Sequence, residues 1–234
     1  MKVSIILPTL NEEKNIFKIV KLIKKNTKPL KNEIIFVDDN SSDNTRKEII
    51  KVKKKFKNIK KIFRNERNLS TAFISGLKIS TGSLIVLMDS DMQHDPRNIK
   101  KSIIKMQKDN SDMIIGSRFL KGSKNFKGTL ISLFRLSLSK TFINLFNLIF
   151  SSNISDPLSG FFVVKKSKIY EKERFLYKKG FKIVMDYYLL LKNKTKITEI
   201  PISLNKRQNG ESKLNFKILY LIIKKVFFNL KKND

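Results

Sequence analysis

The chain has 234 residues, which is enough for one sizeable domain with its own hydrophobic core. It contains no cysteine, and this excludes disulfide and thiolate chemistry. The formal net charge of +30 favours anionic partners, whether phosphorylated substrates, an acidic membrane surface or nucleic acid. Because the lysines are scattered over the whole chain, the charge alone does not choose among these partners.

The first part of the chain alternates between short apolar runs and segments with helical periodicity. The expected strands cover residues 3–7, 33–37, 59–63 and 84–88. The expected helices begin at Asn11, with acidic residues in the first turn, and then cover about 45–56 and 68–81. Such alternation predicts an α/β fold with a Rossmann-like, mostly parallel sheet and helices on both faces.

The second part continues this pattern and adds two apolar helical segments. Further elements are expected as strands at 112–115, 161–164 and 197–202 and as helices after Pro96 and at about 182–192. Residues 129–150 form either a core helix or helices that lie on a membrane surface. Residues 216–230, apolar with interposed lysines, form either a basic amphipathic helix or an ordinary packing helix. We expect no spanning helix and no secretory signal, because every apolar run is too short.

Acidic residues, which are scarce in this basic chain, gather at the ends of three expected strands. They are Glu12, Asp38, Asp39, Asp89 and Asp91. In a parallel sheet these strand ends share one edge, where ligands bind in open α/β folds. Like charges held together repel, and so we expect a metal ion or the polar groups of a sugar to compensate them.

The stretch 83–96 gives the most specific of these signals. If the chain stays extended after the 84–88 strand, alternate side chains point the same way, so that Asp89, Asp91 and Gln93 line one wall. Carboxylate and amide oxygens suit Mg²⁺ or Mn²⁺ held together with substrate phosphates. The alternative is a solvated acidic turn after a strand, with Asp95 capping the next helix.

Six motifs occur in order along nearly the whole chain. They are Pro8-Thr9-Leu10-Asn11-Glu12, Asp38 to Thr45, Asp89-Ser90-Asp91-Met92-Gln93-His94, Gly116 to Phe119, Asp156 to Phe162, and Arg207 to Leu214. The first three resemble motifs of the family-2 glycosyltransferases of GT-A fold. The last three resemble the polyprenol-phosphate (dolichol-phosphate) mannosyltransferase branch of that family. The chain departs from the pattern at Leu10, where an aromatic residue is usual, and at Asn40 and Asn44, where glycine is usual.

This resemblance implies a role for each matching residue. The residues implied to bind the donor nucleotide sugar are Pro8, Leu10, Glu12, Asp39, Asp89, Ser90 and Lys213. Asp89 would face the ribose and the sugar, while Asp91 and Gln93 would hold the Mg²⁺ or Mn²⁺ that bridges the donor diphosphate. The lone His94 is expected in a supporting or surface role.

The resemblance also implies a set of phosphate-binding arginines. Arg118, Arg135 and Arg207, with Lys213, would bind the phosphate of a lipid acceptor and the donor diphosphate. Together with Asp89 and Asp91, these arginines would form the catalytic centre. Only eight positions of this lysine-rich chain are arginine, and three of them fall at these places. Arginine matches phosphate with two parallel hydrogen bonds, which lysine cannot do.

The implied activity is an inverting, metal-dependent transfer of a hexose, first of all mannose from GDP-mannose, to a polyprenyl (dolichyl) phosphate. An acceptor phosphate is already anionic at neutral pH, and so no strong general base is needed. One alternative is transfer from a UDP-sugar, such as glucosyl transfer, to polyprenyl phosphate or to a glycan. The alternative outside enzymes is a basic nucleic-acid-binding module, but we find no basic-aromatic recognition motif and expect no nucleic-acid partner.

The expected organisation is a GT-A catalytic domain over residues 1–213, including interface helices at about 126–150. A C-terminal amphipathic basic helix over residues 214–234 would follow. The protein would act peripherally at the cytoplasmic face of a membrane. It would bind the anionic membrane surface either by itself or through a membrane-anchoring subunit.

Overall fold

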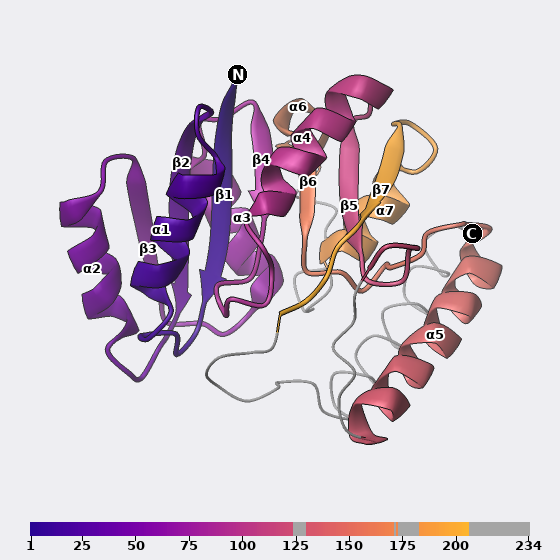
Figure 1. Cartoon of the computed structure of the whole chain (residues 1–234), viewed down its shortest axis with the longest axis horizontal. Helices are drawn as coiled ribbons and strands as arrows, with labels where there is room; N and C mark the ends of the chain where they lie inside the picture. The colour runs from indigo at the N-terminus through magenta and orange to yellow at the C-terminus, as the bar shows by residue number, and fades with distance from the viewer. Residues whose placement is uncertain (124–129, 171, 173–182, 206–234) are drawn as a thin grey trace.

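The computed structural model describes residues 1–123, 130–170, 172 and 183–205, and it describes side chains over the same ranges except 130–138. One seven-stranded sheet runs through the molecule in the order β3-β2-β1-β4-β6-β5-β7 (Figure 1). The strands are β1 (Lys2–Thr9), β2 (Lys31–Asp39), β3 (Ile59–Arg64), β4 (Leu84–Leu87), β5 (Met113–Ser117), β6 (Phe162–Lys165) and β7 (Ile197–Pro201). The helices are α1 (Ile16–Asn26), α2 (Thr45–Lys55), α3 (Leu69–Ile79), α4 (Arg97–Asp109), α5 (Leu130–Phe150), α6 (Lys166–Ile169) and α7 (Ile183–Leu191).

The sheet is mostly parallel, as the alternation of strands and helices predicts. β1 pairs in parallel with β2 and β4, β2 with β3, and β5 with β7. β6 alone runs the other way, between β4 and β5. Its direction was not predicted, because the apolar run at 161–164 carries no information about which neighbours it joins. The reversal brings the loop before β6 to the same edge as the ends of β4 and β5.

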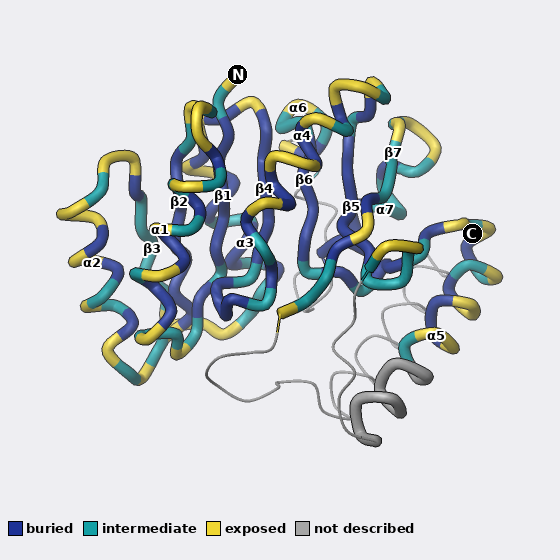
Figure 2. The backbone as a smooth tube through the Cα atoms, in the orientation of Figure 1, coloured by how far each residue is buried: buried dark blue, intermediate teal, exposed yellow. Residues whose placement is uncertain are grey.

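Helices cover both faces of the sheet, as predicted, and each face has its own core. On one face α1, α2 and α4 pack against inward side chains of β1 such as Val3, Ile5 and Leu7. On the other face α3, α5 and α7 pack against Ile6 and its neighbours. The inner strands β1, β2, β4, β5 and β6 are therefore buried on both sides, and this explains their continuous apolar runs, whereas the edge strands β3 and β7 are only partly buried (Figure 2).

Helix α5 combines the two interpretations of its sequence. Phe142 and Phe146 are buried in the core beneath the sheet. Leu145 and Leu148, on the opposite side of the helix, are 52% and 78% exposed. The described part of the helix is thus a core helix that also carries an exposed apolar side.

Two details of the expected elements are wrong. The first helix begins at Ile16 and not at Asn11, because Asn11 has a positive φ of 56° and residues 12–15 form a turn. Its acidic residues therefore lie in a loop and not in a first helical turn. The chain also does not stay extended after β4, because it bends at residues 90–92 and Met92 has a φ of 68°.

No helix in the described ranges is long and apolar enough to cross a membrane. The predicted tail helix at 216–230 and the two residues Arg207 and Lys213 lie outside the described residues. The proposed boundary between 1–213 and 214–234 lies there as well, and it stays a prediction.

Candidate functional site

The loops that carry the predicted site meet at one edge of the sheet, which we call the carboxyl edge. β1, β2, β4 and β5 all end there, and β6 starts there, at the lower side of the sheet in Figure 1. The register places Thr9 beside Asp38 and Leu87 beside Phe162. The Ser90 hydroxyl donates to the Pro8 carbonyl at 3.0 Å, and this bond ties the loop after β4 to the end of β1.

The loops after β1 and β2 are joined by hydrogen bonds through their polar residues. The Glu12 N–H donates to Thr45 Oγ1 at 2.7 Å, and the Asn11 N–H donates to Ser41 Oγ at 2.9 Å. The Glu12 carboxylate accepts from the Asn15 amide at 2.6 Å. Leu10, half-buried in the same loop, lies next to these groups. The two loops therefore form one wall of the site.

Arginines of this chain compensate the acidic pair at the end of β2. Asp38 is fully buried and accepts from Arg46 Nε at 2.5 Å. Asp39, 6% exposed, lies 3.3 Å from Arg64 through Oδ1 and accepts the Asn68 N–H through Oδ2 at 2.9 Å. The expectation that a metal or a sugar must neutralise these acids is therefore wrong for this pair. Arg46 and Arg64 had no predicted role, because the sequence does not show which strands become neighbours.

One oxygen of the Asp39 carboxylate is ion-paired with Arg64 but accepts no hydrogen bond. Its Oδ1 is buried and accepts no hydrogen bond from the part of the chain that the structure describes. Burial raises the pKa of Asp39 to about 6, although Arg64 and the Asn68 N–H pull it down. A buried acceptor without a hydrogen bond has a free-energy cost, which the nearby Arg64 charge offsets only in part.

The loop after β4 places its polar residues differently from the expected single row. Asp91 is buried, and its Oδ1 accepts the Gln93 N–H at 3.0 Å. The side chain of Asp89 is 41% exposed, and Gln93 is half-buried. In the described ranges, no group of three or more His, Asp or Glu side chains is arranged to hold a metal ion.

His94 is buried beneath this loop, and of the two expected roles this leaves the supporting one and excludes a surface position. Its Nδ1 accepts the Asp89 N–H at 3.2 Å and lies 3.6 Å from the Asp89 carboxylate. Gly160 packs against both groups, because a Cβ there would lie 2.7 Å from Asp89 Oδ2 and 3.0 Å from His94 Cε1. His94 and Gly160 together hold Asp89 from below.

Arg118 follows β5 and is held by a buried carboxylate. Its Nε and Nη2 donate to the two oxygens of Asp156 at 2.7 and 2.8 Å, and its backbone N–H donates to Oδ2 at 3.1 Å. Burial alone would lower the pKa of Arg118, but the hydrogen bonds and charge of Asp156, with the charge of Asp89, raise it. The guanidinium is therefore a fixed positive charge that interacts electrostatically with Asp89.

Asp156 begins one of the six sequence motifs, but no role was predicted for it. Of the other predicted site residues, Arg135 lies on α5, but its side chain is outside the described ones. Arg207 and Lys213 are beyond the last described residue. The Asn205 N–H donates to the Gln93 carbonyl at 2.9 Å, so the described chain ends against the loop after β4.

Comparisons with known proteins agree on one family. The model described as "Glycosyl transferase family 2" matches residues 4–172. A dolichol-phosphate mannosyltransferase of Pyrococcus furiosus is 37% identical over 97% of this chain, and the chain spans 63% of that protein's length. A dolichol-phosphate mannosyltransferase of Mycosarcoma maydis is 32% identical, over 93% of this chain and 75% of its own.

Solved structures share the fold. A crystal structure of glucosyl-3-phosphoglycerate synthase from Mycobacterium tuberculosis aligns with a TM-score of 0.69. The match covers 98% of this chain and 78% of that one, at 16% sequence identity. The mostly parallel sheet with helices on both faces is the GT-A architecture of such neighbours.

Proposed function

Because the chain belongs to glycosyltransferase family 2, we propose that it transfers mannose from a nucleotide sugar to a polyprenyl phosphate of the dolichyl type. The observation that carries the proposal is the 37% identity to the Pyrococcus dolichol-phosphate mannosyltransferase over 97% of this chain. The groups at the carboxyl edge support the proposal. They include the buried carboxylates of Asp39 and Asp91 and the arginine Arg118, which Asp156 holds in place.

The donor nucleoside would lie against the wall formed by the loops after β1 and β2. Pro8, Leu10 and Glu12 lie on this wall, and Ser90 is bonded to it. In this proposal Oδ1 of Asp39, which lies 3.3 Å from Arg64 and accepts no hydrogen bond, would accept the N–H groups of a nucleobase. Guanine, the base of GDP-mannose, offers an adjacent ring N–H and amino group, which suits a carboxylate.

The donor atoms of the loop after β4 fit Mg²⁺ or Mn²⁺. Asp91 and Gln93 offer the carboxylate and amide oxygens that these ions prefer. Sites for Mg²⁺ commonly use one or two carboxylates with substrate phosphates, and so a cluster of three acidic groups is not required. A bound ion would neutralise the donor diphosphate. The Mycobacterium synthase was crystallised with Mn²⁺ and UDP.

The reaction would be a single displacement. An oxygen of the acceptor phosphate attacks the anomeric carbon, the bond from that carbon to the diphosphate breaks, and the configuration inverts. The nucleoside diphosphate leaves with the bonding electron pair, and no proton has to be removed from the nucleophile. Arg118 would bind phosphate oxygens near Asp89, together with Arg135, Arg207 and Lys213.

The lipid acceptor places the reaction at a membrane in this proposal. The exposed Leu145 and Leu148 of α5 and the net charge of +30 support peripheral binding to an anionic surface at the cytoplasmic face. A membrane-anchoring subunit is the alternative way to hold the protein there.

A donor panel tests the proposed function. The protein is incubated with GDP-mannose, UDP-glucose or other nucleotide sugars, Mg²⁺ or Mn²⁺, and a short polyprenyl phosphate, and the lipid is identified by mass. We expect a mannosyl lipid from GDP-mannose only. A glucosyl lipid from UDP-glucose would replace the donor assignment, and no lipid product with any donor would overturn the proposed function.

A further inference from the structure

The loop that carries Asp156 is itself held by a second carboxylate, that of the half-buried Glu199. Glu199 lies on β7, where it pairs with Ile115 of β5. Its Oε2 accepts the Ser155 N–H at 2.9 Å, and its Oε1 accepts the Ser155 hydroxyl at 2.8 Å and the Asp156 N–H at 3.3 Å. Both oxygens of Glu199 are thus used to fix two consecutive residues of the loop.

These contacts continue without a break to the centre of the site. Glu199 holds the backbone of Ser155 and Asp156, and Asp156 holds Arg118 through three hydrogen bonds. Arg118 in turn interacts electrostatically with Asp89, whose charge raises the pKa of Arg118. Each member is held by the one before it, and Asp156 is fully buried, so the arginine has little freedom to choose another orientation.

The carboxylates of the buried Asp156 and the half-buried Glu199 disfavour each other electrostatically, and the structure tolerates that cost. Burial raises the pKa of Glu199, the nearby charge of Asp156 raises it further, and the three hydrogen bonds from Ser155 and Asp156 lower it in part. A glutamate that only stabilised the fold would not need to lie beside another acid. Its position is explained if the orientation of the Asp156–Arg118 pair matters.

We propose that Glu199 is a positioning residue that acts through Asp156 to orient the Arg118 guanidinium toward the substrate phosphates. The proposal rests on the proposed function for the identity of those phosphates. The orientation itself can be measured without any reaction. Because Glu199 does not touch substrate in this proposal, its effect must pass through Arg118.

Glu199→Gln is the variant that tests this. The amide keeps the size of the side chain, but its NH₂ group is a donor. In the variant this group faces an N–H or O–H of Ser155 or Asp156 that donates to a carboxylate oxygen in the unaltered protein. We expect the KM for polyprenyl phosphate to rise about tenfold, as for a weakened charge-assisted hydrogen bond. The affinity for the nucleotide alone should not change. The double variant Glu199→Gln with Arg118→Lys should be no worse than Arg118→Lys alone, because both act at one point.

Glu33→Gln is the matched control. Glu33, 1% exposed, is more deeply buried than Glu199 and lies on β2, where it accepts from Ser4 and Thr81 and pairs with Lys60. We expect this variant to lose stability while the KM for the acceptor stays unchanged. If Glu199→Gln does not fold, Ser155→Ala removes the hydroxyl that donates to Oε1 and also contacts the Ser117 hydroxyl, and it should shift the KM in the same direction by less.

A reaction-independent readout separates this proposal from the proposed function. The Nε–H proton resonance of Arg118, assigned by its loss in Arg118→Lys, should shift in Glu199→Gln and stay in place in Glu33→Gln. An unchanged resonance, or additive effects in the double variant, overturns the positioning role. Failure of the unaltered protein to glycosylate any lipid phosphate overturns the proposed function instead, while the resonance still decides the role of Glu199.

Discussion

Asp39 is a buried carboxylate whose proposed role in nucleotide binding has a cost to the fold. Its carboxylate is buried, one oxygen is held by the Asn68 N–H, and the other accepts no hydrogen bond from any described residue. Burial raises its pKa to about 6. In the folded protein Asp39 therefore keeps its proton to a higher pH than in the unfolded chain, so its contribution to stability falls as the pH rises from about 4 through 6.

Nucleotide binding is expected to depend on pH through this residue. Only the carboxylate accepts two N–H groups of a base, and so the affinity for GDP should fall as the pH drops below about 6. Binding near that pH should release a proton, which calorimetry in two buffers of different ionisation enthalpy detects. Asp39→Asn keeps the titration of the nucleotide itself, and so the difference between the two pH profiles isolates Asp39. Identical profiles would contradict the assignment.

Asp91 offers a second test at the level of one residue. Asp91→Ala removes the carboxylate proposed to bind metal, and we expect sugar transfer to fall by about a thousandfold or more. The unfolding transition should remain cooperative, because the variant keeps the surrounding core. Transfer is measured with GDP-mannose and a polyprenyl phosphate, and Mn²⁺ binding is measured by calorimetry.

The neighbouring Asp95 supplies the control for this experiment. Asp95 accepts the first N–H of α4 from Arg97 at 2.9 Å, as expected of a helix cap, and has no proposed part in catalysis. Asp95→Asn should retain transfer. If Asp91→Ala is folded and active, the metal assignment is wrong.

At the scale of the elements, Asn40 shows how a loop survives without its usual glycine. Asn40 has a φ of 62°, in the left-handed region that glycine adopts freely. Asn44, the other position where glycine is usual in the family, has a φ of −79° and caps α2 without a side-chain hydrogen bond. The two departures are therefore not equivalent, and only the first needs a residue that tolerates a positive φ.

This difference predicts unequal effects of the same substitution. Asn40→Ala should lower the free energy of unfolding by about 1 kcal/mol, because alanine is strained in the left-handed region. Asn44→Ala should change it by less than about 0.5 kcal/mol. Urea unfolding with a common slope measures both. Equal losses would show that the backbone conformation of Asn40 is not the cause.

The positions of the helices and strands were predicted more accurately than the conformation of the turns that follow them. Apolar runs such as Leu84 to Leu87 identified the inner strands, because burial on both faces requires them, and the alternation of strands and helices identified the partly buried edge strands β3 and β7. Turns depend on single backbone angles, and the positive φ values of Asn11 and Met92 follow no rule of periodicity. For that reason the start of α1 and the row of side chains after β4 were wrong.

Pairing across strands was also beyond the sequence. Arg46 on α2 forms an ion pair with Asp38 on the preceding strand β2. Arg118 and Asp156, by contrast, form an ion pair only because β6 runs antiparallel between β4 and β5. The family motifs placed Asp39, Asp89 and Arg118 in one region, and the structure gives each a partner. The resemblance could identify candidate site residues such as Arg118. Identifying the residue that holds each of them, such as Asp156 for Arg118, required the strand register of the sheet.

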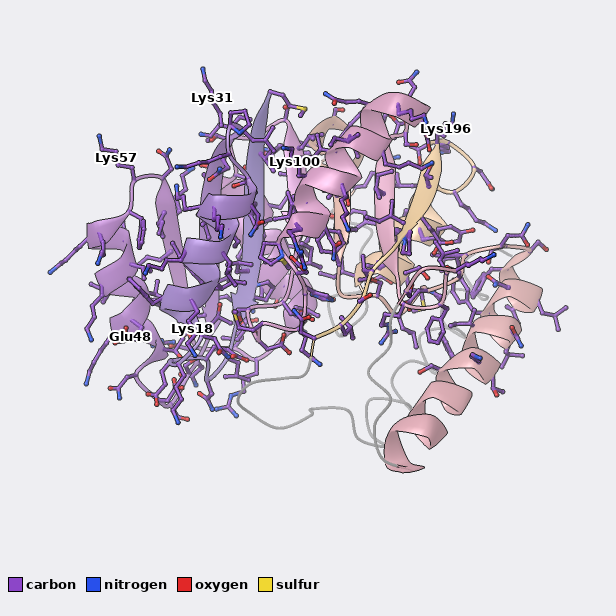
Figure 3. All side chains as sticks on the ribbon, in the orientation of Figure 1. Lys18, Lys31, Glu48, Lys57, Lys100 and Lys196 are labelled. Atoms are coloured by element: carbon purple, nitrogen blue, oxygen red, sulfur yellow. The ribbon has the colours of Figure 1, made fainter. Side chains whose placement is uncertain are left out.

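At the scale of the whole molecule, the positive charge surrounds the described body without gathering in one cleft. The lysines labelled in Figure 3 come from well-separated elements, and all are exposed. They are Lys18, Lys31, Lys57, Lys100 and Lys196. A charge spread in this way attracts an anionic surface at long range and adds little specificity.

Vesicle flotation tests whether this charge acts at a membrane. We expect binding to vesicles rich in anionic lipid, a loss of most binding when salt shortens the screening length, and no binding to neutral vesicles. Binding that remains at high salt should disappear in the double variant Leu145→Ser, Leu148→Ser if the exposed side of α5 inserts. No binding to anionic vesicles at moderate salt would favour a membrane-anchoring partner.

The reversed strand β6 also limits the order in which the sheet can be assembled during synthesis. β3, β2, β1 and β4 are neighbours in the sheet and come from the first part of the chain, so they can pair early. β5 has only β6 and β7 beside it, and only β6 connects it to β4. An emerging chain therefore carries the apolar segment Met113–Ser117 without a strand partner until residues 162–165 have left the ribosome. During that interval its open edge can pair with another chain, and aggregation is favoured most.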